Sequence, residues 1–429
     1  MSNLPAVLRS ILAGAMLGAT VAACGSNDST SPPTPTNTLV VTPARLVLGV
    51  GMSRQLSAAV LDPSGVAVSG APVSYLSSDP SRVSVSPDGL VSYVGEGQAE
   101  IRASSEDLLA VVPYTGVRSG HPLGTTTTSL RLPGDQMGDA PFGAVVDGEG
   151  RIFITQADSG LVASGFYPVT GFTIQDLGGT PTSITLLAGG AALVTPTGPD
   201  ARDVSVIELS SGRVLAQVPL EVPAFSAVTA PDSGTAYLGT NDGRVLTFDV
   251  ASSTVTGSID LGIEKSRVNH LAVNAAGSLL YASSFTTGTI SEIDLASKSV
   301  RRIFVVGGEP QGIAISLDGT ELYVANESGN GHIDVYNVVA NVHETTIASG
   351  ATSSLGGPFA LAMSPDGAAV YVGVITTEGT GLIQVVNTGT RAIERTINSC
   401  GQVPRRIAFG FSGGLAVIAD ETGCVTFVE

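Results

Sequence analysis

Residues 312–326, GIAISLDGTELYVAN, decide the fold of this 429-residue chain. Two short apolar runs flank an Asp-Gly turn in this stretch, which is the pattern of two antiparallel β-strands joined by a tight turn. Looser copies of the stretch lie on both sides of it. A ring of such units builds a binding surface, whereas a single hairpin is only one piece of another core, so the first question is whether the unit repeats.

The glycine that closes the turn recurs at a regular interval. Successive turn glycines are separated by 40, 44, 43, 42, 48 and 46 residues, at Gly150, Gly190, Gly234, Gly277, Gly319, Gly367 and Gly413. Each is followed by an apolar run, and an acidic residue or Asn ends the next strand at Glu208, Asp249, Asp294, Asn337, Asn387 and Glu429. A unit of about 44 residues with four short antiparallel strands is the signature of a β-propeller blade. The sequence therefore predicts seven blades.

The seventh unit lacks its fourth strand, because the chain stops at Glu429. An unpaired strand edge promotes association, and ring closure removes it. The segment SLRLPG, residues 129–134, matches the fourth strand SIDLG at 258–262. We therefore predict that a strand at about 125–133 closes the ring, with residues 126–132 pairing with 424–429.

Residues 310–337, PQGIAISLDGTELYVANESGNGHIDVYN, also resemble the YVTN family of propeller repeats, with LYVAN as the near match. The likeness extends over roughly 139–429. It implies a propeller fold and leaves the activity open, because propellers host lactonases, quinoprotein and haem enzymes, lectins and scaffolds.

Ahead of the repeats, residues 38–117 carry short alternating runs with turn signals such as DPSG and SPDG, which suit a small antiparallel sandwich. The runs VTPARLVLGVGMSRQLSAAV, VSYLSSDPSRVSVSPDGLVS and GEGQAEIRA resemble a bacterial Ig-like domain of the Big2 type. Tyr75 stands where that family usually has Trp. The resemblance implies a spacer, or less often an adhesion module, followed by the propeller at 118–429.

The N-terminus carries an export signal. The apolar run SILAGAMLGATVAAC at 10–24 is too short to span a bilayer as a helix and has the length of a signal-peptide core. Its end, VAAC, resembles the lipobox of bacterial lipoproteins, which implies cleavage after residue 23 and diacylation of Cys24. An ordinary signal cleaved elsewhere is the alternative. Residues 24–37 are rich in Ser, Thr and Pro and predict a disordered tether. We expect an exported protein anchored by lipid to the bacterial cell envelope, at the outer membrane or cell surface.

Composition indicates the fold class, and net charge limits the kinds of partner that the chain can bind. Only 13% of residues are charged, glycine is abundant with 53 residues, and long helical periods are absent, so the chain is expected to be all-β: a small Ig-like sandwich followed by a seven-bladed propeller. The formal net charge is −17. Binding to nucleic acid depends on Lys and Arg that neutralise phosphates. We therefore expect no nucleic-acid partner, and a monomer.

Known catalytic and metal-binding motifs are missing from the sequence. The four histidines, His121, His270, His332 and His343, show no H-x-x-x-H spacing. C-x-x-C-H and P-loop motifs are absent as well. We accordingly predict no catalytic residue, no metal ligand and no cofactor.

The mouth of the predicted channel is the best place for a ligand site. Loops and first residues of the inner strands bring polar and aromatic side chains toward one opening, namely Asn269, His270, Gln311, Phe359, Arg405 and Arg406. Two cations, an imidazole, amides and an aromatic face suit a small anionic molecule or a peptide carboxylate. The alternative interpretation is that these polar residues cap strands and that the arginines pair with neighbouring acids.

Besides Cys24, the chain contains only Cys400 and Cys424. Both lie in the exported part, where thiols oxidise, and on the same face of the predicted propeller. We predict a disulfide between them, with a reactive thiol pair as the alternative.

These observations favour a lipid-anchored, non-catalytic propeller that binds an unknown protein, a glycan or a small anionic ligand. The competing hypothesis is a propeller enzyme, either a lactonase-like hydrolase or a cofactor-dependent dehydrogenase, with its site at the channel mouth.

Overall fold

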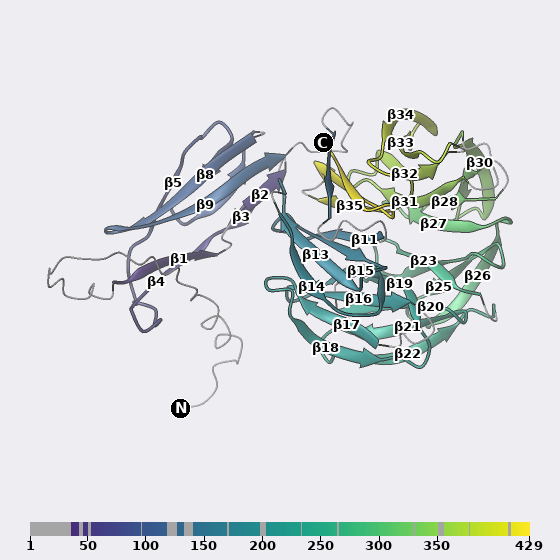
Figure 1. Ribbon diagram of the computed structural model, residues 1–429, viewed down its shortest axis with the longest axis horizontal. Coiled ribbons are helices and arrows are strands. Elements are labelled where there is room, and N and C mark those ends of the chain that lie inside the picture. Colours follow the sequence, from purple (N-terminus) through teal and green to yellow (C-terminus); the bar gives the residue numbers. More distant parts are fainter. Residues whose placement is uncertain are drawn as a thin grey trace, which may run out of the picture. The chain divides into compact units, whose positions relative to one another are not determined.

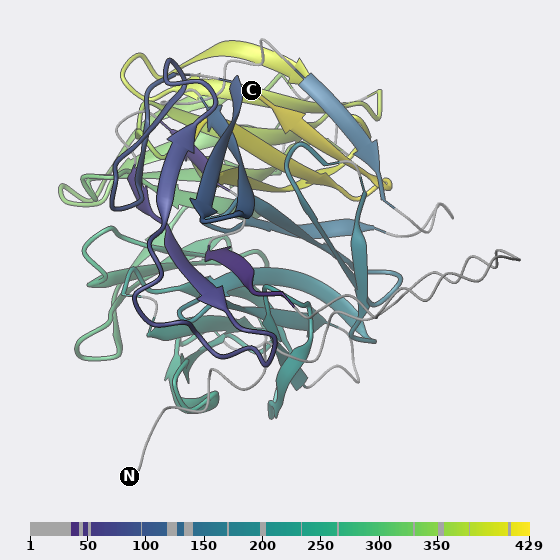
Figure 2. The same ribbon diagram turned by 90° about the vertical axis from the view of Figure 1, so that its left-hand side faces the viewer.

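Figure 1 shows the computed structural model of the chain. It describes residues 36–42, 46–49, 53–95, 97–117, 127–132, 140–169, 171–197, 203–232, 234–263, 266–328, 331–350, 356–376, 378–410 and 413–429. The predicted signal peptide and Cys24 lie outside these residues. The named secondary-structure elements of the described residues are all β-strands, and Figures 1 and 2 show no coiled ribbon among them. Within the same residues, no helix is long and apolar enough to cross a membrane.

The chain divides into two compact units, with the main boundary between Gly116 and Val117. The strands before this boundary are β1 (Thr38–Thr42), β2 (Leu46–Gly49), β3 (Ser53–Gln55), β4 (Ser57–Leu61), β5 (Ser74–Ser77), β6 (Val83–Val85), β7 (Leu90–Tyr93), β8 (Gly97–Ser105) and β9 (Leu108–Val117). They form the antiparallel sheets β1-β4, β2-β9-β8-β5 and β3-β7-β6. Buried Val83, Val91, Ile101 and Val112 contribute to the core of this unit.

Tyr75 is half-buried on β5. Its ring lies against the SPDG turn, where a Cβ added to Gly89 would come within 3.0 Å of the tyrosine ring. Gly89 also has a φ of +88°, which favours glycine. The close approach and the backbone conformation together explain why this turn ends in glycine.

The second unit repeats one pattern of four antiparallel strands. The first strands are β11 (Pro141–Val146), β15 (Thr180–Leu187), β19 (Ala224–Thr229), β23 (Val268–Val273), β27 (Pro310–Ile315), β31 (Pro358–Met363) and β35 (Pro404–Gly410). The second strands are β12 (Arg151–Gln156), β16 (Ala191–Thr197), β20 (Thr235–Thr240), β24 (Leu279–Ser284), β28 (Glu321–Asn326), β32 (Ala369–Ile375) and β36 (Leu415–Asp420).

The third strands are β13 (Leu161–Phe166), β17 (Asp203–Glu208), β21 (Arg244–Asp249), β25 (Thr289–Asp294), β29 (His332–Asn337), β33 (Gly381–Asn387) and β37 (Cys424–Val428). The fourth strands are β14 (Thr173–Asp176), β18 (Val214–Pro219), β22 (Thr254–Asp260), β26 (Ser299–Val305), β30 (Val342–Ala348), β34 (Ala392–Asn398) and β10 (Thr127–Arg131). The all-β fold with repeated four-stranded antiparallel sheets is consistent with a β-propeller.

The sheets follow one another in a closed order. Each first strand contacts the first strand of the next sheet, and β35 contacts β11. Clusters of buried hydrophobic side chains join neighbouring sheets in the same way: Tyr323 and Val335 pack with Val372 of the next sheet, for example. Another cluster brings Phe427 of the last sheet together with Ile152 of the first. Burial between sheets therefore links the end of the unit to its beginning.

The last sheet combines strands from both ends of the second unit. β10 pairs antiparallel with β37, with Ser129 opposite Thr426, and the strand order is β10-β37-β36-β35. This is the pairing that the sequence predicts. Leu132, just after β10, is almost fully buried in the cluster that contains Phe427. The edge of β37 is thus covered by backbone hydrogen bonds and by apolar packing.

A disulfide joins Cys400, in the link between β34 and β35, to Cys424 at the start of β37. It is the pair that the sequence predicts. The backbone N–H of Cys400 also donates to Thr426 Oγ1 at 2.9 Å. A covalent bond and a hydrogen bond therefore hold β37 to the link that precedes its own sheet.

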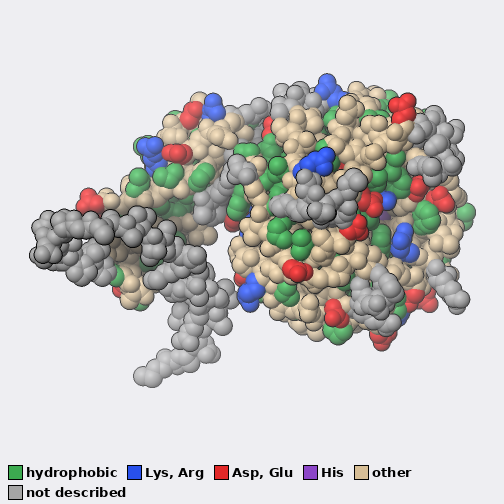
Figure 3. All heavy atoms as spheres, in the orientation of Figure 1, with side chains coloured by type: hydrophobic (Ala, Val, Ile, Leu, Met, Phe, Trp, Pro, Cys, Tyr) green, Lys and Arg blue, Asp and Glu red, His purple; other side chains and the backbone are tan. Residues whose placement is uncertain are grey.

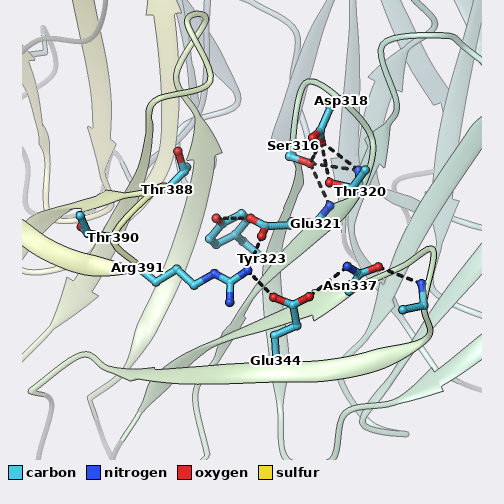
Figure 4. A network of polar contacts seen from close by, with 12 residues as sticks. Ser316, Asp318, Thr320, Glu321, Tyr323, Asn337, Glu344, Thr388, Thr390 and Arg391 are labelled. Carbon is cyan, nitrogen blue, oxygen red and sulfur yellow. Dashed lines mark hydrogen bonds and ion pairs between the residues drawn. The ribbon is translucent and has the colours of Figure 1, made fainter.

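A polar network ties the fifth repeated sheet to the sixth (Figure 4). Arg391, in the turn between β33 and β34, donates to the carboxylates of Glu321 on β28 and Glu344 on β30. Tyr323 donates its hydroxyl to Glu321 at 2.7 Å, and Asn337 Nδ2 donates to Glu344 at 2.9 Å. The Arg391 charge is thus matched by two carboxylates of the neighbouring sheet.

Candidate anion-binding site

Each first strand of the second unit carries a β-bulge near its start. The bulge leaves an extra residue without a partner on the second strand, at Phe142, Thr182, Phe225, Asn269, Gln311, Phe359 and Arg405. A bulge bends the strand and re-aims a side chain away from the regular alternation. The same irregularity, repeated in every sheet, therefore brings these side chains out of the ladder where the first strands meet.

A cavity of about 180 Å³ lies at this end of the first strands. Its lining residues come from six of the repeated sheets: Phe142, Phe225, Arg267, Asn269, His270, Gln311, Gly312, Phe359, Arg405 and Arg406. All six ligand-binding candidates from the sequence are among them. Of the other histidines, His332 and His343 both contact Asp334, at 3.2 and 3.1 Å, and do not line the cavity. His121 lies outside the described residues.

Four lining residues were not predicted: Phe142, Phe225, Arg267 and Gly312. The repeat holds a signal for the two phenylalanines. Gln311, Phe359 and Arg405 each stand eight residues before their turn glycine, and so does Phe142, whereas Phe225 stands nine before its own. Arg267 precedes β23 by one residue and has no such signal.

The three arginines of the cavity differ in their partners. Arg405 forms an ion pair with Glu421 through Nε, and its guanidinium lies over Phe359, 4.8 Å from the ring centroid. Arg267 lies over Phe225 at 4.2 Å, and its Nε donates to Asn269 Oδ1 at 2.6 Å. For Arg406, no ion pair or hydrogen bond to another described residue is formed by the guanidinium. The expected pairing of arginines with acids thus holds for Arg405 and not for Arg406.

Arg406 keeps its positive charge. Its side chain is partly exposed where it lines the cavity, and desolvation by the surrounding protein lowers its pKa to about 10. A group with that pKa remains protonated at neutral pH. Arg406 therefore presents a positive charge to the cavity that no described carboxylate neutralises.

His270 is kept neutral beside this charge. Burial lowers the pKa of its imidazole well below the ordinary value, and the positive charge of Arg406 lowers it further. Its Nδ1 accepts a hydrogen bond from the backbone N–H of Ile313 at 3.3 Å. The proton of the neutral ring is therefore on Nε2, so the imidazole is a hydrogen-bond donor at that atom.

A relay of hydrogen bonds fixes the polar side of the cavity. Asn269 Nδ2 donates to Gln311 Oε1 at 2.8 Å, and Gln311 Nε2 donates to Glu327 Oε2 at 2.5 Å. With the bond from Arg267 to Asn269, the relay runs from a cation to a carboxylate. Burial raises the pKa of Glu327, although the bond from Gln311 opposes the rise. The two amides are engaged with each other and with their neighbours.

This arrangement favours an anion. Arg267 and Arg406 form no ion pair among the described residues, and aromatic rings flank the polar groups. In the part of the chain that the structure describes, no group of three or more His, Cys, Asp or Glu side chains is arranged to hold a metal ion.

Comparisons with known proteins support the fold. No known protein family matches the sequence, and no curated protein matches it either. Among solved structures, a chain of Kuenenia stuttgartiensis hydrazine synthase aligns with a TM-score of 0.59 and 16% sequence identity, covering 72% of this chain and 99% of that chain. At this identity the likeness concerns the fold alone.

Proposed function

We propose that the chain is an exported, lipid-anchored protein whose second unit is a seven-bladed β-propeller that binds a small anionic ligand without catalysing a reaction. The blade count is supported by the closed order of the four-stranded sheets and by the pairing of β10 with β37. Deletion of residues 125–133 is expected to lower Tm or to cause association through the open edge of β37. Unchanged Tm and an unchanged monomer in light scattering would contradict the closed seven-bladed ring.

The anchor and the spacer rest on sequence resemblance. VAAC ending at Cys24 resembles a lipobox, residues 38–117 resemble a Big2-type Ig-like domain, and the repeats resemble the YVTN family. An anchor, a tether and a spacer would hold the propeller outward from the membrane. Replacing Cys24 with Ala is expected to release the protein from the membrane fraction. A variant that stays as membrane-bound as the parent would contradict the lipid anchor.

The observation that carries the binding function is the unpaired guanidinium of Arg406. A charge that is partly removed from water is normally paired, because desolvation is costly unless an opposite charge or hydrogen bonds compensate it. Arg405, the adjacent residue, follows this rule through Glu421. We infer that the missing negative charge at Arg406 is supplied by the ligand.

Isothermal titration calorimetry of the full chain with a panel of small carboxylates and inorganic phosphate tests this function. The Arg406→Ala variant is expected to lose at least tenfold in affinity for any anion that the parent binds. Arg213→Ala removes the same charge from an exposed turn outside the cavity and serves as the matched control. Equal affinity in parent and Arg406→Ala would place the binding elsewhere.

The enzyme hypothesis has less support. A hydrolase needs a nucleophile or a metal with a base, and the cavity lining offers one histidine and no carboxylate. That histidine already accepts a backbone hydrogen bond at Nδ1, which leaves its neutral ring a donor rather than a base.

A further inference from the structure

We propose that the ligand is a small aromatic carboxylic acid, with its carboxylate on Arg406 and its ring among the phenylalanines of the cavity. This inference rests on the proposed anion-binding function and names the class of anion. Three features of the cavity carry it: its size, its aromatic walls and the small number of free donors.

The size limits the ligand to about one ring. A cavity of about 150 Å³ holds benzene, whereas sites for drug-sized ligands measure about 300–1,000 Å³. At about 180 Å³, the cavity has room for a six-membered ring and one carboxylate group. The cavity is open on one side, so a larger acid would extend out of this volume towards solvent.

The walls suit a flat apolar group. Phe142 and Phe225 meet edge to face, with ring centroids 5.8 Å apart, and Phe359 lines the same cavity. The guanidinium of Arg267 lies over Phe225, and that of Arg405 lies over Phe142 and Phe359, so the walls combine rings and cations. Aromatic rings stack favourably on phenyl groups and on guanidinium planes.

The free donors suit a carboxylate. The fork of Arg406 matches a carboxylate with two parallel hydrogen bonds, and the Nε2–H of His270 provides another donor on the same lining. Asn269 and Gln311 are already engaged in the relay to Glu327. Arg267 forms no ion pair among the described residues, but its guanidinium lies over Phe225 and its Nε donates to Asn269. A phosphate has more charge and more acceptor oxygens to satisfy, and phenyl rings offer it no donor. The balance of donors and rings therefore favours an aromatic acid over an inorganic oxyanion.

Calorimetric titration of the full chain with benzoate, cyclohexanecarboxylate, benzamide and inorganic phosphate tests the inference. Benzoate is expected to bind at least tenfold more tightly than each of the other three. Arg406→Met is expected to weaken benzoate binding at least tenfold, with Arg213→Met as the control for charge. Phe359→Leu is expected to weaken benzoate several-fold, which provides a second variant should Arg406→Met fail to fold.

The outcomes separate the two proposals. Phosphate binding that depends on Arg406, without benzoate binding, would overturn the aromatic acid and leave the anion site standing. Equal affinity for benzoate and cyclohexanecarboxylate would also overturn the aromatic preference. Absence of binding by every acid and by phosphate would contradict both proposals.

Discussion

Two arginine clusters of the second unit differ in what neutralises them. Arg391 lies in the turn between β33 and β34 and contacts two carboxylates of the neighbouring sheet, Glu321 and Glu344. Arg406 lies on a first strand and lines the cavity without a carboxylate partner among the described residues. The first cluster is complete within the protein, as a structural contact should be. We propose that an anion completes the second, as it would in a binding site.

On the face seen in Figure 3, acidic and basic side chains are scattered among polar and apolar ones. With a net charge of −17, the chain has a general repulsion for anions. Anion binding would therefore depend on the charged and polar side chains that line the cavity.

The largest effect is expected when the cavity receives a carboxylate of its own. Phe359→Glu places an acid beside Arg405 and Arg406 and makes the cluster resemble that of Arg391. We expect the affinity for the carboxylate ligand to fall more than tenfold relative to Phe359→Leu, because the new side chain competes with the ligand. Calorimetric titration of both variants measures the difference. Equal affinities would show that the negative charge of the ligand does not contact these arginines.

His270 is expected to make stability sensitive to pH. Its pKa is well below the ordinary value when folded, so below about pH 6.5 the unfolded chain takes up a proton that the folded chain does not. Stability is therefore unaffected by this group above that pH and falls as the pH decreases, by up to about 1.4 kcal/mol for each pH unit. Urea unfolding at pH 7, 6 and 5 measures the trend. His270→Gln should reduce the slope, and an unchanged slope would mean that His270 titrates normally.

A smaller effect is expected at Arg391. Arg391→Ala removes a partly exposed cation from two carboxylates, and a lowering of Tm by about 1–3 °C is expected for a contact of this kind. The affinity for the ligand should not change. Arg406→Ala should give the opposite pattern, with loss of affinity and no loss of stability. Similar behaviour of the two variants would remove the distinction between the clusters.

The smallest effect concerns Glu344. Hydrogen bonds from Asn337 and Arg391 lower the pKa of its carboxyl. A group with a lowered pKa contributes stability above its ordinary pKa of about 4.5, and this contribution is lost as the pH falls through the folded value. Thermal unfolding between pH 5 and pH 3 should therefore show a shallower loss in Arg391→Ala than in the parent. A steeper loss in the variant would contradict the assignment.

The strands could be predicted because the same pattern of apolar runs and turns recurs in each repeat. The turn glycines give the period and so locate the loops that enter the first strands, which is why Gln311, Phe359 and Arg405 could be predicted to face one opening. The closing strand could be found for the same reason, since the last repeat was one strand short.

The state of each charge could not be predicted. Glu421, the partner of Arg405, is sixteen residues away on the far side of a turn, and the spacing that marks Arg405 as the bulge residue does not tell which of the two arginines pairs with it. The arginine that pairs with Glu421 is decided by how the bulge directs the two side chains, and only the three-dimensional structure shows this. Arg267 was missed because it precedes its strand and lies outside the repeat pattern.

The most direct test is a crystal structure of the full chain with 4-bromobenzoate, recorded at the bromine absorption edge. We predict one anomalous peak inside the cavity, among Phe142, Phe225 and Phe359, with the carboxylate of the ligand on the Arg406 guanidinium. An empty cavity at a ligand concentration that saturates binding in solution, or a carboxylate bound away from Arg406, would contradict it.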